Sequence, residues 1–476
     1  MKLSVTVTGL VYAAAILLAG GMLYAFVPEL WGAEMVRLLV AGGIATAAYR
    51  LLCPATKAGY FVILAAWTLL AVGFSLNLWW FTAANGGTVT EPVLANNDAF
   101  TLWEQLQGVV GGYETTHGIR LLGTASILNA VFLGAAPRVD NLMTLSVLCT
   151  LLAIVFTGGA AAGALEDADR RTRQRISVLA MGLMAAVCYF LASGVLIIKD
   201  ALECMLMAVA AWATVGIVGK KNTAYAWPAL IAVVALSRIT RPYQLCFLGI
   251  LFTMTAAFIC RRHKWSAAAL TVLVAGCGVL LYDSFVNVEA VSVLETSPGR
   301  TQFHIGDIDS SRLAAFNTIT GNIYGLSLLQ RLVKLPFFAA VQFFTPLPWA
   351  FARDTVFGPS QAWAHVSYPW YAVAGLFLFF LIFCLRRAPK LLVLMAIFYC
   401  MAFLATAYVT GGTVSRYCLP WLPFLTPCAA WTVVAGEWRR RTFRIYAICD
   451  AAAVAIGLAV IFKMLNIYSP GGWEAS

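Results

Sequence analysis

Long apolar blocks separated by short polar stretches dominate the chain. Each block is about 20 residues long, which is the length a helix needs to cross a hydrocarbon core of about 30 Å. No small-residue cleavage site follows the first block, so we expect a retained helix rather than a signal peptide. The blocks that predict membrane-crossing helices are residues 8–27, 32–52, 58–82, 142–164, 176–198, 201–219, 223–241, 243–260, 265–285, 369–385, 390–410, 418–436 and 444–463.

Two longer polar stretches interrupt the apolar blocks, at residues 83–137 and 286–368. Within the first, residues 118–136 are apolar but contain Arg120. This pattern favours an interfacial or re-entrant helix over a helix that crosses the membrane. No polar segment is long enough for a separate soluble domain. We therefore expect residues 1–476 to form one all-α polytopic membrane domain with two large loops.

Lysine and arginine gather in short clusters between the blocks, at Arg170–Arg175, Lys220–Lys221, Arg261–Lys264, Arg386–Lys390 and Arg439–Arg444. Cytoplasmic loops of membrane proteins carry such clusters. If all five clusters are cytoplasmic, the number of blocks between consecutive clusters is even, so the assignment is self-consistent. It predicts about 13 crossings, with the N-terminus in the cytoplasm and the C-terminus and both large loops outside.

The composition agrees with a membrane protein and excludes several other classes. The chain is 61% hydrophobic and 11% charged, whereas soluble proteins carry roughly 25% charged residues. The net charge of +11 comes from the loop clusters and does not indicate nucleic-acid binding. The twelve cysteines lie mostly inside apolar blocks without paired spacing, so neither a disulfide framework nor a zinc site is expected.

Asp98, in the first polar loop, is the candidate catalytic residue. Glycosyl transfer needs a carboxylate that takes a proton from the acceptor hydroxyl and cations that stabilise the departing phosphate. A carboxylate at the start of a short outer helix suits the first role. The alternative is that Asp98 caps this helix, since Asn96, Asn97 and Asp98 are all good N-cap residues. Glu104, six residues later, is expected to be solvated.

Cations that break the positive-inside pattern are candidates for binding phosphate. Lys199 and Asp200 stand between two apolar blocks joined with almost no loop, and charges in such a place tend to be functional. Glu203 is a third carboxylate near them, which could join the site or pair with Lys199. Arg238 and Arg241 are three residues apart, which predicts one helical face. A tight turn for the first pair and interfacial snorkelling for the arginines remain open.

Further candidates lie in the later outer segments. Arg416 follows a Gly-Gly pair at a predicted helix entrance and suits a phosphate or pyrophosphate clamp. Arg300 and His304 in the second large loop are candidate substrate-binding residues. Asp307 and Asp309 alternate in the same loop, but two such carboxylates are weak evidence for a metal site. We therefore expect no bound cofactor and no required metal, while a divalent cation stays possible.

Several short motifs resemble those of GT-C-type glycosyltransferases and of bacterial membrane proteins that assemble surface polysaccharides. They are Asp98–Phe100 in the first loop, residues 193–202, Pro346–Trp349 and residues 411–423. The resemblance implies a GT-C-like fold and a bacterial inner membrane location. It also implies that Asp98 is the catalytic base, that the donor is a polyprenyl-phosphate-linked sugar, and that the acceptor is a lipid-linked glycan, another glycan or a protein.

Two alternatives stay open. A polymerase of oligosaccharide repeat units, of the O-antigen or capsule type, would use the same cations to bind two lipid-linked chains without a catalytic carboxylate. A transporter or flippase would need inverted repeats and polar residues at the membrane midplane, and the polar residues of this chain instead gather at one predicted face.

Overall fold

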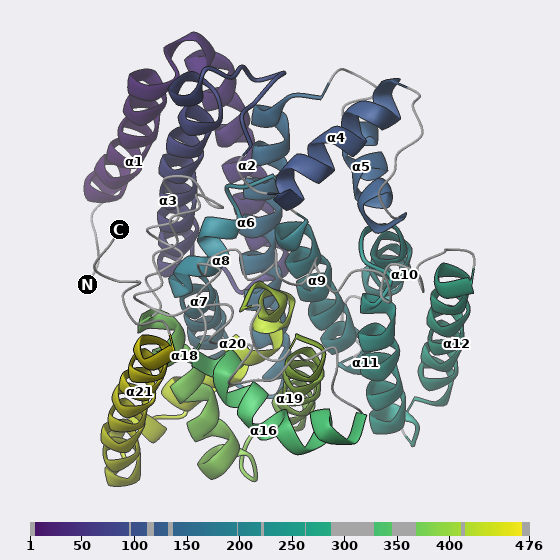
Figure 1. Ribbon diagram of the computed structural model, residues 1–476. Coiled ribbons are helices and arrows are strands. Elements are labelled where there is room, and N and C mark those ends of the chain that lie inside the picture. Colours follow the sequence, from purple (N-terminus) through teal and green to yellow (C-terminus); the bar gives the residue numbers. More distant parts are fainter. Residues whose placement is uncertain are drawn as a thin grey trace.

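The computed structural model describes residues 5–94, 97–111, 119–131, 137–197, 199–219, 223–261, 263–286, 328–344, 368–410 and 415–468. The regular elements of this part of the chain are all helical (Figure 1). Eight of the described helices are long and apolar enough to cross a membrane, namely α1, α2, α3, α6, α9, α12, α19 and α21. The all-α class of a multi-helix membrane protein is thus supported, whereas the count of thirteen crossings stays a prediction.

The α-helices have the following bounds: α1 Val5–Phe26, α2 Trp31–Leu52, α3 Lys57–Phe81, α4 Asn97–Gly111, α5 Ile119–Val131, α6 Val139–Ala164, α7 Arg170–Ala186, α8 Cys188–Ser193, α9 Asp200–Val218, α10 Thr223–Thr240, α11 Gln244–Ile259, α12 Lys264–Val286, α16 Leu328–Phe344, α18 Tyr368–Phe379, α19 Lys390–Thr410, α20 Leu422–Val434 and α21 Arg441–Tyr468. Short helical turns include η6, Ser415–Trp421, which leads into α20.

Helix α6 lies at the centre of the bundle and packs against α2, α3, α7, α9 and α20 (Figure 1). Its second half is rich in glycine and alanine. Gly158 lies against Met181 of α7, and Gly159 and Gly163 lie against Trp212 and Val215 of α9. Small residues allow helix backbones to approach closely within a membrane. These glycines therefore explain why α6 can have neighbours on all sides.

Helix α7 and the segment after it differ from the predicted helix 176–198. Helix α7 begins earlier, at Arg170, because the Asp169 carboxylate caps it by accepting a hydrogen bond from the Thr172 N–H at 2.6 Å. This hydrogen bond lowers the pKa of Asp169. The helix then ends at Ala186 and is followed by the short helix α8 and a non-helical stretch from Gly194 to Ile197.

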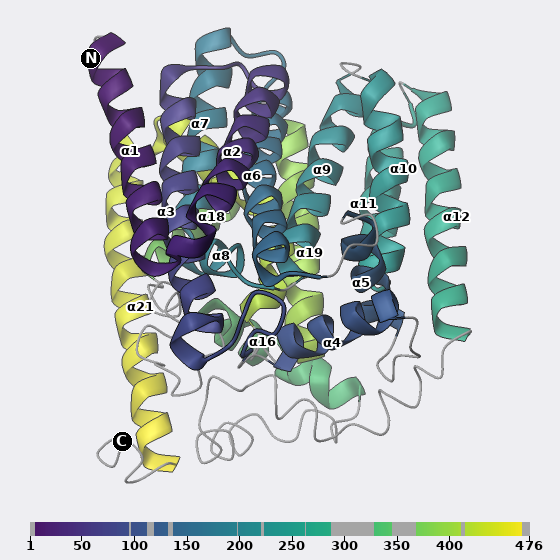
Figure 2. The same ribbon diagram turned by 90° about the horizontal axis from the view of Figure 1, so that it is seen from above.

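Helices α4 and α5 lie across one end of the bundle (Figure 2). The described part of α5 has 13 residues, about 20 Å at 1.5 Å per residue. That residues 118–136 form an interfacial or re-entrant helix stays a prediction. Helices α1 and α21 run in the same direction, and the connections α2–α3, α6–α7, α9–α10 and α11–α12 all lie at the end of the bundle opposite to α4 (Figure 2). The predicted basic clusters near Arg170 and Arg261 are therefore at one end.

Candidate functional site

The non-helical stretch before α9 is the centre of the site. Membrane proteins tolerate open backbone at this depth only where neighbouring groups satisfy its carbonyls. Here the Asn77 amide of α3 donates to the Val195 carbonyl at 3.1 Å, and the Ser146 hydroxyl of α6 donates to the Leu196 carbonyl at 2.8 Å. Two buried side chains thus hold this stretch in place. It ends at Lys199, which directly precedes α9.

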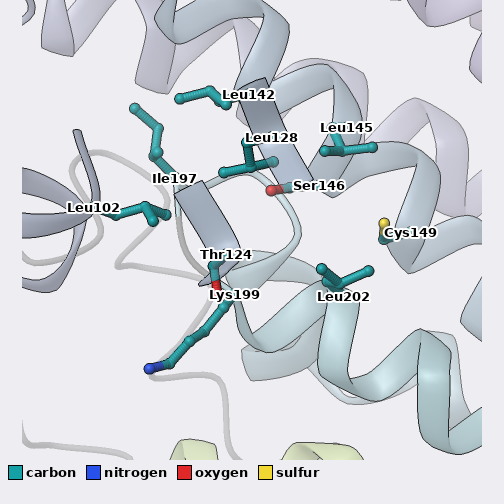
Figure 3. A pocket seen from close by; sticks show the side chains of 10 residues that line it. All are labelled: Leu102, Thr124, Leu128, Leu142, Leu145, Ser146, Cys149, Ile197, Lys199 and Leu202. Atoms are coloured by element: carbon teal, nitrogen blue, oxygen red, sulfur yellow. The ribbon is translucent and has the colours of Figure 1, made fainter. Parts of the chain in front are cut away.

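A small pocket lies between this stretch, helices α4 and α5, and α6 (Figure 3). Its free volume is about 20 Å³, which is room for one water-sized molecule. The walls are mainly apolar, and the Lys199 side chain carries its nitrogen away from them (Figure 3). The pocket-lining residues are Leu102, Thr124, Leu128, Leu142, Leu145, Ser146, Cys149, Ile197, Lys199 and Leu202.

A buried group of three charges adjoins Lys199. Arg241 Nη1 lies 2.5 Å from Glu203 Oε2 and 3.7 Å from Asp200 Oδ1, and the three side chains are at most 3% exposed. The two carboxylates belong to the first turn of α9, where the positive end of the helix dipole favours negative charge. Glu203 therefore pairs with Arg241, and Asp200 lies within α9 rather than at its N-cap position.

The structure gives Arg238 and Arg241 different surroundings, although the sequence predicts one helical face for both. Helix α10 ends at Thr240, and Arg241 belongs to the turn that contains Pro242 and leads into α11. Arg238 is exposed, whereas Arg241 is buried. The Arg241 N–H still donates to the Ser237 carbonyl at 2.8 Å, so the difference in burial comes from the contacts of the Arg241 side chain with Asp200 and Glu203. Arg241 also lies 5.2 Å from the centre of the Tyr243 ring.

Asp98 lies in the first turn of α4, which begins at Asn97; its side chain is outside the described part of the structure. One turn later, Leu102 lines the pocket together with Lys199. Glu104 is exposed, as expected for a solvated residue. Gln105 is 2% exposed, and both polar atoms of its amide lack a hydrogen-bond partner among the described residues. Helix α4 thus places its buried face over the same region as Lys199.

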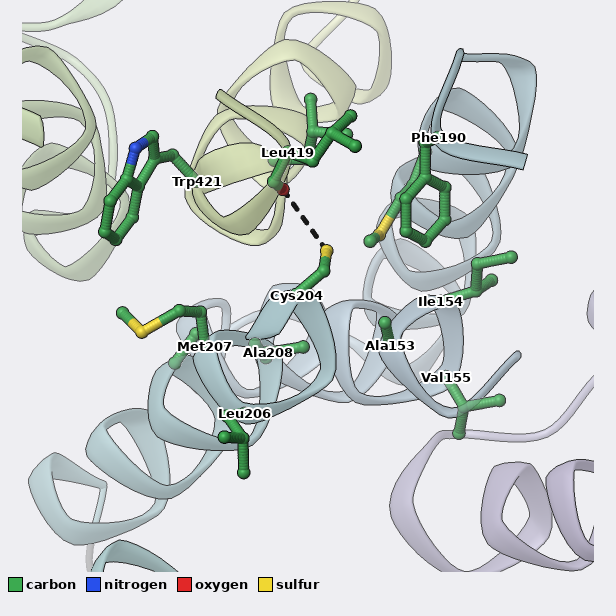
Figure 4. Packing of buried hydrophobic residues seen from close by; sticks show 14 of the residues in the cluster. Ala153, Ile154, Val155, Phe190, Cys204, Leu206, Met207, Ala208, Leu419 and Trp421 are labelled. Carbon is green, nitrogen blue, oxygen red and sulfur yellow. Dashed lines mark hydrogen bonds between the residues drawn. The ribbon is translucent and has the colours of Figure 1, made fainter. Parts of the chain in front are cut away.

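The short helix η6, which contains Arg416, packs against α9. The Cys204 thiol donates to the Leu419 carbonyl at 3.2 Å (Figure 4), and the Trp421 ring lies 4.4 Å from that of Phe247 in α11. The Arg416 side chain is outside the described part of the structure. Arg300 and His304 lie outside the described residues altogether, as does Pro346–Trp349.

A second ionic group was not singled out from the sequence. Arg37 Nη1 of α2 lies 2.5 Å from Glu34 Oε1 and 3.0 Å from Asp140 Oδ2 of α6. Arg138 Nε and Nη2 donate to the same Asp140 carboxylate. Both carboxylates are fully buried. The sequence contains one signal that could have revealed this group, because the charged residues Glu34 and Arg37 lie within the apolar block 32–52.

The described residues contain no group of three metal-ligating side chains, and all twelve cysteines are unpaired. Comparison with protein-family models, with curated proteins and with solved structures found no match for this chain.

Proposed function

We propose that this protein is a membrane glycosyltransferase that uses a lipid-phosphate-linked sugar at the end of the bundle covered by α4 and α5. One observation carries the proposal. Helix α4, which contains Asp98 in its first turn, and Lys199 contribute to the same pocket. The helix with the candidate base and one candidate phosphate ligand therefore line the same pocket, although they are about 100 residues apart in the sequence.

The proposed reaction assigns one role to each group. The acceptor hydroxyl attacks the anomeric carbon of the donor sugar, the bond from that carbon to the phosphate oxygen breaks, and the lipid phosphate leaves. Asp98 takes the hydroxyl proton. Lys199 and the exposed Arg238 stabilise the charge on the leaving phosphate, and Arg416 is a further candidate for this role. Arg300 and His304 stay candidates for substrate binding on the second large loop.

Arg241 has a different role in this proposal. Its side chain is only 3% exposed and faces the two buried carboxylates Asp200 and Glu203, so a phosphate group outside cannot reach it. It instead fixes the first turn of α9 and, with it, the position of Lys199. Arg241 and Asp200 are thus positioning residues rather than ligands, which revises the substrate-binding role expected for both.

The apolar walls of the pocket suit part of a lipid chain, but about 20 Å³ cannot hold one. Substrate entry therefore requires α4 and α5 to move away from α6 and α9. The acceptor would be a lipid-linked glycan or another glycan, and the proposed location is the inner membrane of a bacterium with α4 and α5 on the non-cytoplasmic side. No soluble cofactor and no nucleic acid take part in this scheme.

The decisive variant is Asp98→Asn, because it keeps the shape of the side chain and removes the carboxylate proposed as the general base. Loss of general-base catalysis costs about 10²–10⁴-fold in rate, so we expect glycan output in host cells, and release of polyprenyl phosphate in proteoliposomes, to fall by that much. Glu104→Gln is the matched control, since it changes an exposed carboxylate of the same helix and should retain activity.

Wild-type output from Asp98→Asn, with normal membrane insertion, would remove this carboxylate from the mechanism. If Lys199→Met then still abolished chain growth, the repeat-unit polymerase would become the better description. Solute uptake by proteoliposomes without any glycan product would instead support a transporter.

A further inference from the structure

The ionic group formed by Glu34, Arg37, Arg138 and Asp140 has no role in the proposed reaction. It joins the start of α2 to the start of α6. Both guanidinium groups contact the single carboxylate of Asp140, so they lie close together. The carboxylates are fully buried, whereas each arginine side chain is 34% exposed. The two cations thus form the accessible side of the group.

Each arginine has N–H groups that do not bond to the two carboxylates. Arg138 uses Nε and Nη2 on Asp140, and Arg37 uses Nη1 on both carboxylates. A guanidinium has five N–H donors in a fixed fork. Within the described residues, no hydrogen bond involves Arg138 Nη1 or Arg37 Nε and Nη2. Two neighbouring arginines with unused donors match the oxygens of a phosphate group.

The group is neutral when both carboxyls are ionised, so an anion would be attracted by the two exposed guanidinium groups rather than by a net charge. The Asp140 carboxylate already occupies the N-terminus of α6, where it accepts a hydrogen bond from the Asn141 N–H at 2.9 Å. Arg138 is the N-cap residue of this helix, so its remaining donors lie at this end of α6.

This group lies near the pocket described above. Both involve the first part of α6, where Asp140 and Leu145 are separated by roughly 8 Å along the axis at 1.5 Å per residue. The Val139 N–H donates to the Val89 carbonyl of the first outer loop, so the group is also at the end of the bundle where α4 lies.

We propose that Arg37 and Arg138 form a binding site for the phosphate or pyrophosphate group of a second lipid, next to the one at Lys199. A transfer between two lipid-linked molecules needs two such groups, so the assignment of this lipid as the acceptor rests on the proposed function. The binding site itself does not depend on that function.

The test uses the full chain in nanodiscs of phosphatidylcholine, titrated with inorganic pyrophosphate and with farnesyl diphosphate. Tryptophan fluorescence during heating reports binding, because a ligand of the folded state raises Tm. We expect saturable binding by the wild type. Arg37→Gln and Arg138→Gln should each weaken it about tenfold or more, which is the effect of losing hydrogen bonds to a charged group.

Arg440→Gln is the matched control, because Arg440 is ion-paired with Glu437 at 2.9 Å in the turn before α21. It should leave the affinity unchanged. Arg138→Lys keeps the positive charge but loses the planar arrangement of guanidinium donors, so it should show an intermediate affinity. Because it keeps the charge, it should still fold if the glutamine variants do not. If the ionic group had only a structural role, Arg37→Gln and Arg138→Gln would lower the Tm of the ligand-free protein without changing its affinity for any ligand.

Comparing the different ligands distinguishes the possible sources of the bound phosphate group. Tighter binding of farnesyl diphosphate than of pyrophosphate indicates a polyprenyl lipid, whereas competition by added phosphatidylglycerol indicates a membrane head group. Wild-type affinities in Arg37→Gln and Arg138→Gln, or no binding of any probe, would overturn the site. Asp98→Asn should bind normally, so failure of the proposed reaction and failure of this site give different results.

Discussion

Arg241 Nη1 lies 2.5 Å from Glu203 Oε2, and both side chains are nearly fully buried where α10 ends and α9 begins. Asp200 Oδ1 lies 3.7 Å from the same nitrogen. Burying an ionised group is costly unless an opposite charge and hydrogen bonds compensate. These charges therefore stabilise one another in a buried position, and the group joins the end of α10 to the start of α9.

We expect Arg241→Met to destabilise the protein by about 3–5 kcal/mol, because it leaves two buried carboxylates without their cation. Arg238→Met, three residues earlier and exposed, should change the stability by less than about 1 kcal/mol. Reversible unfolding in mixed detergent micelles measures both. The double variant Arg241→Met with Glu203→Gln should recover part of the loss. Equal effects of the two arginine variants would contradict a buried ionic group.

Much of the fold could be predicted from the apolar blocks. They place the long helices correctly because each block is long enough to cross the membrane and is bounded by polar residues. The broken helix after α7 could not be predicted in this way. Residues 194–197 are as apolar as a helix, and what holds them open is a pair of distant donors, Asn77 and Ser146.

The site could be predicted only in part. Lys199, Asp200 and Arg241 stand out because charges between apolar blocks are rare, and the structure brings them together. Their pairing could not be derived, since Glu203 lies nearer to Lys199 in sequence but contacts Arg241 across 38 positions. Arg37 lies inside the apolar block 32–52 and its partner Asp140 lies just before the block 142–164, so only the packing of α2 on α6 reveals their contact.

The docking of α5 on α10 is a further testable feature, because α4 and α5 cover the pocket. Gly123 of α5 lies so close to the Ile239 carbonyl that a Cβ atom would overlap it, and the Thr124 hydroxyl lies 3.5 Å from the Thr240 carbonyl. We expect Gly123→Ala to push α5 away and expose Cys149, which lines the pocket and is 3% exposed.

N-ethylmaleimide labelling of Cys149, followed by peptide mass spectrometry, measures this opening. The rate should rise about tenfold for each 1.4 kcal/mol of weakened docking. Gly182→Ala is the control, since Gly182 has open space around its Cβ position, and Cys204, buried against η6, is the internal reference. Unchanged labelling of Cys149 in Gly123→Ala would show that α5 does not close the pocket.

The sidedness of the membrane domain is the last prediction. Helix α11 begins next to Arg241 and its 16 residues carry the chain about 24 Å to Cys260 at 1.5 Å per residue. Cys260 is exposed there among basic residues, which predicts a cytoplasmic position. Glu91 is exposed in the loop after α3, at the end where α4 lies. A membrane-impermeant thiol reagent should therefore label Glu91→Cys in intact cells, and Cys260 only in inverted vesicles. The opposite pattern would place Asp98 and Lys199 on the cytoplasmic side and contradict the proposed non-cytoplasmic site.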